Sequence, residues 1–155
     1  FASFTAVYLA CFRDYSSVLS PGERGLVLIV CPDRRQSRTC LGYIRALLEA
    51  VPALAAMVDR HTQDAIHLTN GISIEVASKR FQTVRGYTIV AYILDECAFL
   101  PTDDSASPDT ELVNALDPAM LTVPGALSML ISSPHAKRGP GGRTWAGPAG
   151  RRGRR

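Results

Sequence analysis

The sequence predicts an α/β protein built on an open, mostly parallel β-sheet with flanking helices. Three short apolar runs, at 26–31, 88–94 and 126–131, have the continuous pattern of strands that are covered on both faces, as in parallel sheets. Helical or hairpin segments separate these runs, which is the order expected of an open α/β sheet. Each run ends in a polar cluster, and such sheets bind their ligands at the carboxyl ends of the strands.

Length and composition fit a single globular domain. The chain has 155 residues, of which 46% are hydrophobic and 20% are charged, and this excludes a disordered chain and a coiled coil. No apolar run approaches the ~20 residues that cross a bilayer, so an integral membrane protein is not expected. The amino-terminal residues also lack the pattern of a secretory signal. Because the chain starts at Phe1 and not at methionine, we expect it to be a piece of a longer protein.

Basic residues gather at the carboxyl-terminal end. Residues 135–155 contain seven lysines and arginines and no acid, whereas residues 1–134 contain ten basic and 14 acidic residues. We therefore expect one mildly acidic domain over residues 1–138, followed by a disordered Gly/Pro/Arg-rich tail over 139–155 that has little to bury. The arginines of this tail are candidates for nonspecific DNA binding. A reading-frame error near residue 139 is the alternative explanation of its composition.

The four cysteines are scattered along the chain, without a Cys-x-x-Cys pair and without clustered histidines. This spacing favours reduced thiols over a disulfide framework or a zinc site. The cysteines are Cys11, Cys31, Cys40 and Cys97.

Apolar periodicity predicts the helices. Residues 1–13 are apolar nearly all round, as in a buried helix. Asp33 can cap a helix that runs from residue 34 to about residue 50. Pro52 then marks a break or the first turn of a new helix, and residues 109–116 form a plausible short helix.

Asn70-Gly71 predicts a β-hairpin. The dipeptide lies between two segments of alternating pattern, 65–68 and 72–76. It is the strongest short hairpin signal, because both central residues of a type I′ turn need positive φ.

Asp95-Glu96 follows the 88–94 run directly and is the strongest chemical signal in the chain. Two adjacent carboxylates at the end of a buried strand suit the Walker B site of a nucleotide hydrolase. There, Asp95 would hold Mg²⁺ through water, since the ion keeps most of its hydration shell. Glu96 would orient and deprotonate the attacking water. The alternative is an acidic pair that only caps the segment after the strand.

The segment 92–99 (YILDECAF) resembles the Walker B region of the large terminase subunit of tailed phages, the ATPase that pumps DNA into a capsid. Arg85-Gly86, before the strand, and 130–134 (LISSP), which is similar to the coupling motif, also resemble that family's pattern. The order and spacing of these pieces cover about residues 26–138. The resemblance implies a P-loop NTPase-like fold of the RecA type, incomplete in this chain.

The resemblance also implies roles for three further residues. Arg85 would act as an arginine finger, in cis or from a neighbouring subunit, and the alternative is a surface arginine beside a turn glycine. Ser132 and Ser133 would sense the γ-phosphate and couple hydrolysis to movement. Ordinary turn residues after a strand are the alternative for this pair.

Three polar residues open the predicted helix at 34–50, where related motors contact nucleic acid or nucleotide. Arg34, Arg35 and Gln36 are therefore candidates for DNA or nucleotide contact. They also fit the solvated first turn of a helix, although positive charge there opposes the helix dipole.

For the full protein, the resemblance implies ATP hydrolysis coupled to translocation of double-stranded DNA into a procapsid, with ATP and Mg²⁺ as cofactors. The expected partners are a portal protein, a small terminase subunit and further copies of the chain in a homo-oligomeric ring. No membrane is involved, and the expected location is the cytoplasm of the bacterial host.

A P-loop does not occur in these 155 residues. The motif requires Gly-x-x-x-x-Gly-Lys-Ser/Thr, and neither lysine of the chain, Lys79 or Lys137, follows a glycine. The helix at 1–13 is similar to the one that follows a P-loop, so we expect that motif immediately upstream. The family's RNase H-like nuclease domain is not covered either. We therefore expect this chain to be catalytically inactive by itself.

Two other functions fit the same motifs. A helicase-like, nucleic-acid-dependent ATPase also has an Asp-Glu motif and a small-hydroxyl motif, and a second RecA-like domain downstream would distinguish it. A noncatalytic α/β binding module would use the acidic pair as a cap. In that case Asp95→Ala would leave ATP turnover unchanged in a protein that has its P-loop.

Overall fold

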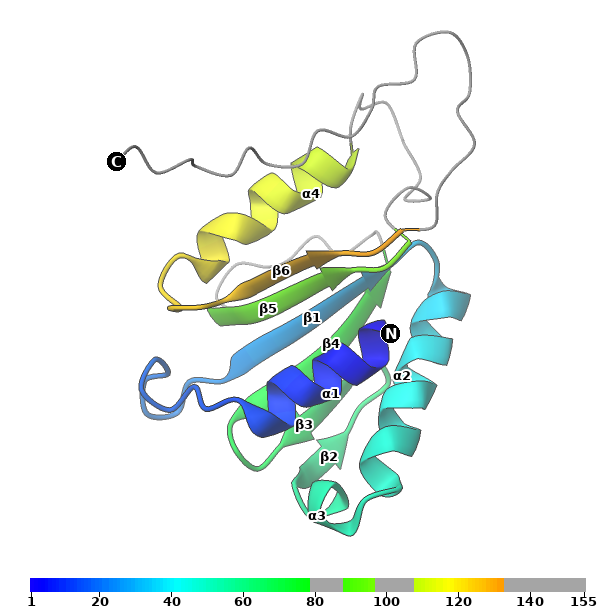
Figure 1. Ribbon diagram of the computed structural model, residues 1–155, viewed down its shortest axis with the longest axis vertical. Helices are drawn as coiled ribbons and strands as arrows, with labels where there is room; N and C mark the ends of the chain where they lie inside the picture. Colours follow the sequence, from blue (N-terminus) through cyan, green and yellow to red (C-terminus); the bar gives the residue numbers. More distant parts are fainter. Residues whose placement is uncertain (79–87, 97–107, 133–155) are drawn as a thin grey trace, which may run out of the picture.

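Six strands form one sheet in the computed structural model, which describes residues 1–78, 88–96 and 108–132 (Figure 1). The strands lie in the order β2-β3-β4-β1-β5-β6. Their bounds are β1 Gly25–Cys31, β2 Val58–His61, β3 Ala65–Leu68, β4 Ile72–Ser78, β5 Thr88–Leu94 and β6 Leu127–Leu130. The helices are α1 Ala2–Phe12, α2 Arg34–Glu49, α3 Pro52–Ala55, α4 Pro108–Leu116 and the 3-10 helix η2 Asp117–Met120.

The predicted mostly parallel sheet is confirmed. β4, β1, β5 and β6 are parallel to one another, whereas β3 pairs antiparallel with β4 and β2 pairs antiparallel with β3. The three apolar runs are β1, β5 and β6. All of β1 is buried because it lies between β4 and β5. For β6 the prediction of cover on both faces is wrong, because β6 is the last strand of the described sheet and Leu130 is 43% exposed.

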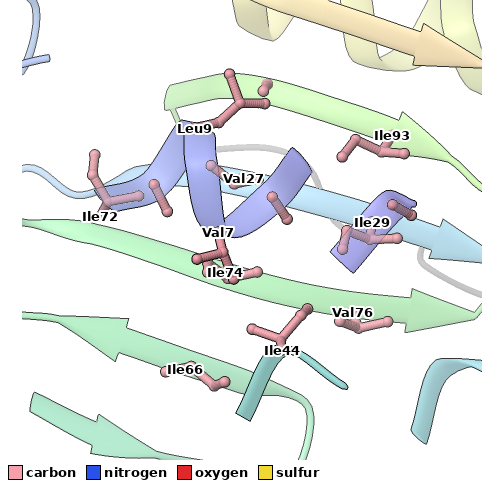
Figure 2. Close-up of a cluster of buried hydrophobic side chains, with 14 of the residues drawn as sticks. Val7, Leu9, Val27, Ile29, Ile44, Ile66, Ile72, Ile74, Val76 and Ile93 are labelled. Carbon is pink, nitrogen blue, oxygen red and sulfur yellow. The ribbon is translucent and has the colours of Figure 1, made fainter. Parts of the chain in front are cut away.

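Apolar side chains of α1 and α2 cover one face of the sheet. Val7 and Leu9 of α1 pack with Val27 and Ile29 of β1, as Figure 2 shows. Successive strand residues point to opposite faces, so the alternate residues of β1 are available to a second layer. That layer belongs to α4, and its core residues are Leu26, Leu28, Val30, Ile89, Tyr92, Leu94 and Leu116.

One polar contact fastens this second layer. The Tyr92 hydroxyl donates to Oδ1 of Asp117 at 2.9 Å and joins β5 to η2. Burial and the hydrogen bond to Asp117 raise the pKa of Tyr92 to about 12. The hydroxyl therefore stays a donor throughout the ordinary pH range.

The predicted hairpin joins β3 to β4, but its turn differs from the expected one. Gly71 has φ +84°, while Asn70 does not have positive φ. Gly71 N–H donates to Leu68 O at 3.3 Å, which gives a three-residue loop that ends in a left-handed glycine. Asn70 holds this loop by its side chain, which donates to Ala10 O of α1 at 2.8 Å and accepts from Ile72 N–H at 3.1 Å. These two bonds favour the observed turn over type I′.

α1 forms where predicted, but it is not buried all round. Its inner face meets the sheet through Ala6 and Ala10, whereas Phe4, Tyr8 and Phe12 are 65%, 53% and 66% exposed. The Tyr8 and Phe12 rings stack with their centroids 6.0 Å apart. The composition of this helix alone could not distinguish the inner face from the outer one, because both are apolar.

The other predicted helices are confirmed. α2 begins after Asp33, whose carboxylate accepts from the N–H of Gln36 at 2.9 Å, and Pro52 is in the first turn of α3. The sequence did not predict β2. The predicted tail at 139–155 lies outside the described residues. Among the residues that the structure describes, no helix is long and apolar enough to cross a membrane.

Candidate functional site

The carboxyl ends of β1, β5 and β6 lie side by side. Asp95 N–H donates to Val30 O of β1 at 2.9 Å, and Ile131 N–H donates to Leu94 O of β5 at 2.8 Å. These two main-chain bonds extend the ladders just beyond the strands. They bring the residues that follow the three strands to one edge of the sheet, as expected for a parallel arrangement.

Asp95 is held from two directions. Its main chain is bonded to β1, and its side-chain Oδ2 accepts a hydrogen bond from Nε2 of Gln36 on α2 at 3.1 Å. Asp95 and Gln36 are both half-buried. The predicted meeting of the Asp-Glu pair with the polar cluster after β1 therefore occurs, through a direct contact between these two side chains.

Glu96 has an unusual backbone conformation. Its φ is +52°, and it is the one non-glycine residue with positive φ in the described part of the chain. A side chain in the left-handed region costs about 1–2 kcal/mol. Residues held in this way gather at functional sites, so the conformation supports a role for Glu96 beyond that of a turn residue.

The first turn of α2 spans three strand ends. Besides the Gln36 bond to Asp95 on β5, the Ser37 hydroxyl donates to Asp33 O at 2.9 Å and to Ala77 O of β4 at 3.3 Å. β1 lies between β4 and β5, so the turn bridges the end of β1 from side to side. Arg34 and Arg35 lie exposed on the same turn.

Two buried thiols lie beneath this edge. Cys31 ends β1 and Cys40 lies on the inner side of α2, and both are free cysteines. The hydrogen bond between them raises the pKa of Cys31 and lowers the pKa of Cys40. Cys40 Sγ also lies 3.2 Å from the Ser3 hydroxyl. The charge of Asp95 also acts on both thiols in the direction that raises their pKa.

The sequence did not reveal this thiol pair or the bond between Gln36 and Asp95. One signal was available for the thiols: Cys31 closes an apolar strand, and Cys40 occupies an apolar position of the next helix. No comparable signal marks the bond to Asp95, because the two residues lie 59 positions apart in the chain.

Not every predicted site residue falls within the described structure. Ser132 lies two residues after the end of β6 and is exposed at the same edge as Asp95. Arg85, Ser133 and Lys79 lie outside the described residues, as does the segment 97–99.

The donor set at this edge suits Mg²⁺. Asp95 offers hard carboxylate oxygens, which Mg²⁺ prefers. No group of three or more His, Cys, Asp or Glu side chains that could hold a metal occurs within residues 1–78, 88–96 and 108–132. Mg²⁺ is commonly bound by one or two carboxylates together with water and substrate phosphates.

Solved structures have a similar fold. The chain is similar to the ATPase domain of the large terminase of Thermus phage P74-26, with a TM-score of 0.60 and 18% identity, over 86% of this chain and 54% of that chain. This chain has the terminase ATPase fold. A point mutant of the same domain gives a TM-score of 0.58 and 17% identity over the same shares of the two chains.

The large terminase of bacteriophage HK97 gives a TM-score of 0.54 and 18% identity, over 76% of this chain and 24% of that chain. The chain thus spans about half the length of the Thermus phage domain and about a quarter of the HK97 protein. No protein-family model and no curated protein matches the sequence. The terminase ATPase fold is P-loop NTPase-like, as predicted.

Proposed function

We propose that this chain is part of the ATPase domain of a phage or prophage large terminase. In the whole protein, ATP hydrolysis would drive double-stranded DNA into a procapsid. A portal protein, a small terminase subunit and further copies of the chain in a ring would be its partners, in the cytoplasm of the host. The observation that carries the proposal is the meeting of Asp95, Glu96 and the first turn of α2 at one sheet edge, in a chain with the terminase ATPase fold.

In this proposal the two acids divide the work. Asp95 binds the nucleotide-associated Mg²⁺ through the carboxylate that Gln36 holds in place. Mg²⁺, when bound, supplies positive charge that offsets the charge on the nucleotide phosphates. Glu96 would orient the attacking water and accept its proton, so that the γ-phosphoryl group is transferred from ATP to water and ADP leaves.

The remaining predicted residues complete the proposal. Ser132, next to the end of β5, would respond to the state of the terminal phosphate, together with Ser133. Arg85 would stabilise charge on the transferred group. Arg34 and Arg35 are exposed beside the site and remain candidates for contact with DNA phosphates.

Metal binding tests the role of Asp95 in the chain as it stands. We expect the 155-residue protein to bind Mn²⁺, used as a paramagnetic substitute for Mg²⁺, in a titration followed by electron paramagnetic resonance. Asp95→Asn should abolish this binding. Asp59→Asn is the matched control, since Asp59 is an exposed carboxylate on β2. Equal Mn²⁺ affinity of Asp95→Asn and the unaltered chain would contradict the proposal.

Turnover tests the role of Glu96. In the longer protein that the proposal implies, Glu96→Gln should lower DNA-stimulated ATP hydrolysis by about 10²–10⁴-fold, the usual contribution of a general base. Mn²⁺ binding to the 155-residue chain should persist in this variant. Glu49→Gln, at an exposed position at the end of α2, is the control and should leave turnover unchanged. ATP hydrolysis by Glu96→Gln at the unaltered rate would reject the assignment.

A further inference from the structure

Gln36 lies in the first turn of α2, and its amide nitrogen bonds to a residue outside this helix. Asp33 is the N-cap of α2, and Gln36 follows it by three residues. In a capping box, the glutamine or glutamate at this position reaches back to the N–H of the cap residue. The amide nitrogen of Gln36, which a capping box does not use because that motif accepts through the side-chain oxygen, donates across the fold to Asp95 on β5.

The position of Gln36 is itself fixed. Its N–H donates to the Asp33 carboxylate at 2.9 Å, and the next residue, Ser37, donates to Asp33 O and to Ala77 O of β4. The first turn of α2 is therefore fastened to β4 on one side and to Asp95 on the other. A donor held in this way restricts the rotation of the carboxylate that it contacts.

The bond also has a defined direction. A carboxylate accepts and does not donate when it is ionised, whereas the glutamine NH₂ group can only donate. The contact with Oδ2 thus turns one oxygen of Asp95 toward α2 and sets the orientation of the other. Metal-binding carboxylates are commonly oriented by hydrogen bonds of this kind, and the loss of such a partner weakens metal binding by about 10- to 100-fold.

We propose that Gln36 is a positioning residue, which orients the Asp95 carboxylate for a divalent cation and joins that carboxylate to the basic first turn of α2. The inference rests on the proposed function, since it takes Asp95 as the metal-binding residue. It assigns Gln36 to Asp95 instead of to DNA or nucleotide. Arg34 and Arg35 lie on the same turn, so a movement of the Asp95 carboxylate would be transmitted to them.

The test uses Gln36→Met, which keeps the length of the side chain and removes its N–H donor. We expect its Mn²⁺ affinity to be about 10-fold lower than that of the unaltered chain, by electron paramagnetic resonance titration. Gln63→Met is the matched control, because Gln63 is exposed and lies before β3, which β4 and β1 separate from β5 in the sheet. Urea unfolding of both variants shows whether the fold is retained.

A second measurement locates the effect. In ¹⁵N-labelled protein, low Mn²⁺ concentrations should broaden the side-chain NH₂ signals of Gln36 before those of Gln63, because broadening depends on distance from the ion. A role of Gln36 in helix stability alone would change the urea midpoint but would leave both the Mn²⁺ affinity and this order of broadening unmoved.

The outcomes separate the two claims. Unchanged Mn²⁺ affinity of Gln36→Met, with binding lost in Asp95→Asn, overturns the role of Gln36 and leaves the proposed metal site intact. Absence of Mn²⁺ binding by the unaltered chain overturns both. A loss of affinity in Gln36→Met that Gln63→Met does not share supports the positioning role.

Discussion

Two clusters of hydrogen-bonded polar side chains lie at opposite ends of the parallel strands. Their contacts are similar, but their roles differ. The amino-end cluster consists of Arg24, His67 and Ser73. The carboxyl-end cluster consists of Gln36, Asp95 and Glu96. Each joins segments that are far apart in the chain, yet only the second carries adjacent carboxylates and a left-handed backbone.

The side chains of the amino-end cluster form hydrogen bonds with one another. Ser73 is 7% exposed, and its hydroxyl lies 2.8 Å from Nδ1 of His67 and accepts from Nε of Arg24 at 3.2 Å. Arg24 also donates to Leu68 O at 2.8 Å. Burial, followed by the charges of Arg60 and Arg24, lowers the pKa of His67, so the imidazole is neutral at pH 7.

The comparison shows that a serine beside a histidine does not identify a reactive site. At the amino end, the polar groups bind one another and hold the β3–β4 hairpin to the start of β1. At the carboxyl end, the backbone is strained and the acids lie where an open α/β sheet binds ligands. The first arrangement stabilises the fold, and the second is suited to chemistry.

The largest expected difference between the two clusters is in their contribution to the stability of the fold. Arg24→Ala removes the bonds to Ser73 and Leu68 and should lower the free energy of unfolding by about 2–3 kcal/mol, since hydrogen bonds to charged groups are among the stronger ones. Urea unfolding measures this change. Arg60→Ala, at an exposed arginine on β2, should have a much smaller effect. If Arg24→Ala also weakened Mn²⁺ binding, the two clusters would not be independent.

A smaller effect on stability should accompany Asp33→Ala at the other end. The variant loses the N-cap bond to Gln36 N–H and should be less stable by about 1 kcal/mol, the usual contribution of such a cap. Because the cap fixes the turn that carries Gln36, Mn²⁺ affinity should fall as well. Asp59→Ala serves as the comparison. A fall in stability with unchanged Mn²⁺ affinity would show that Asp95 does not depend on this turn.

The smallest expected effect concerns Glu75, on the same face of β4 as Ser73. Burial, and then the charge of Asp64, raises the pKa of the Glu75 carboxyl above its ordinary value of 4.5. The native state therefore holds this proton more tightly than the unfolded state, and the stabilisation is lost as the pH rises through the native pKa.

Glu75→Gln should accordingly remove part of the decrease in unfolding free energy between pH 4 and pH 7. We expect a change below about 1 kcal/mol, because solvent screens a half-buried charge. Urea unfolding at several pH values measures it, with Glu49→Gln, at an exposed position of α2, as the control. An identical pH profile for Glu75→Gln and the unaltered chain would contradict the raised pKa.

The sequence predicted the fold best where local pattern and burial agree. β1 and β5 are continuously apolar and lie inside the sheet, so their pattern reports their surroundings directly. β2 was missed because its residues, VDRH, are mostly exposed, and a short polar edge strand has no apolar alternation. The outward face of α1 was missed because aromatic side chains there imitate a core pattern.

The candidate site was predictable as a set of strand ends but not as a set of contacts. Parallel strands bring Asp95 and the residues after β1 to one edge of the sheet, and this placement does not depend on the conformations of the side chains. The choice of Gln36, and not Arg34 or Arg35, as the partner of Asp95 depends on the rotation of α2 about its axis. That rotation is set by the packing of its apolar face, which a short sequence motif does not encode.

The aromatic rings on the outside of α1 bear on how the protein behaves in a test tube. Residues 1–12 carry no charged side chain, so neighbouring molecules meet no electrostatic repulsion along this helix. Salts that strengthen apolar association, such as ammonium sulfate, should therefore precipitate the chain early. Replacing Phe4 and Phe12 with lysine should raise solubility without disturbing the sheet, since both rings face water.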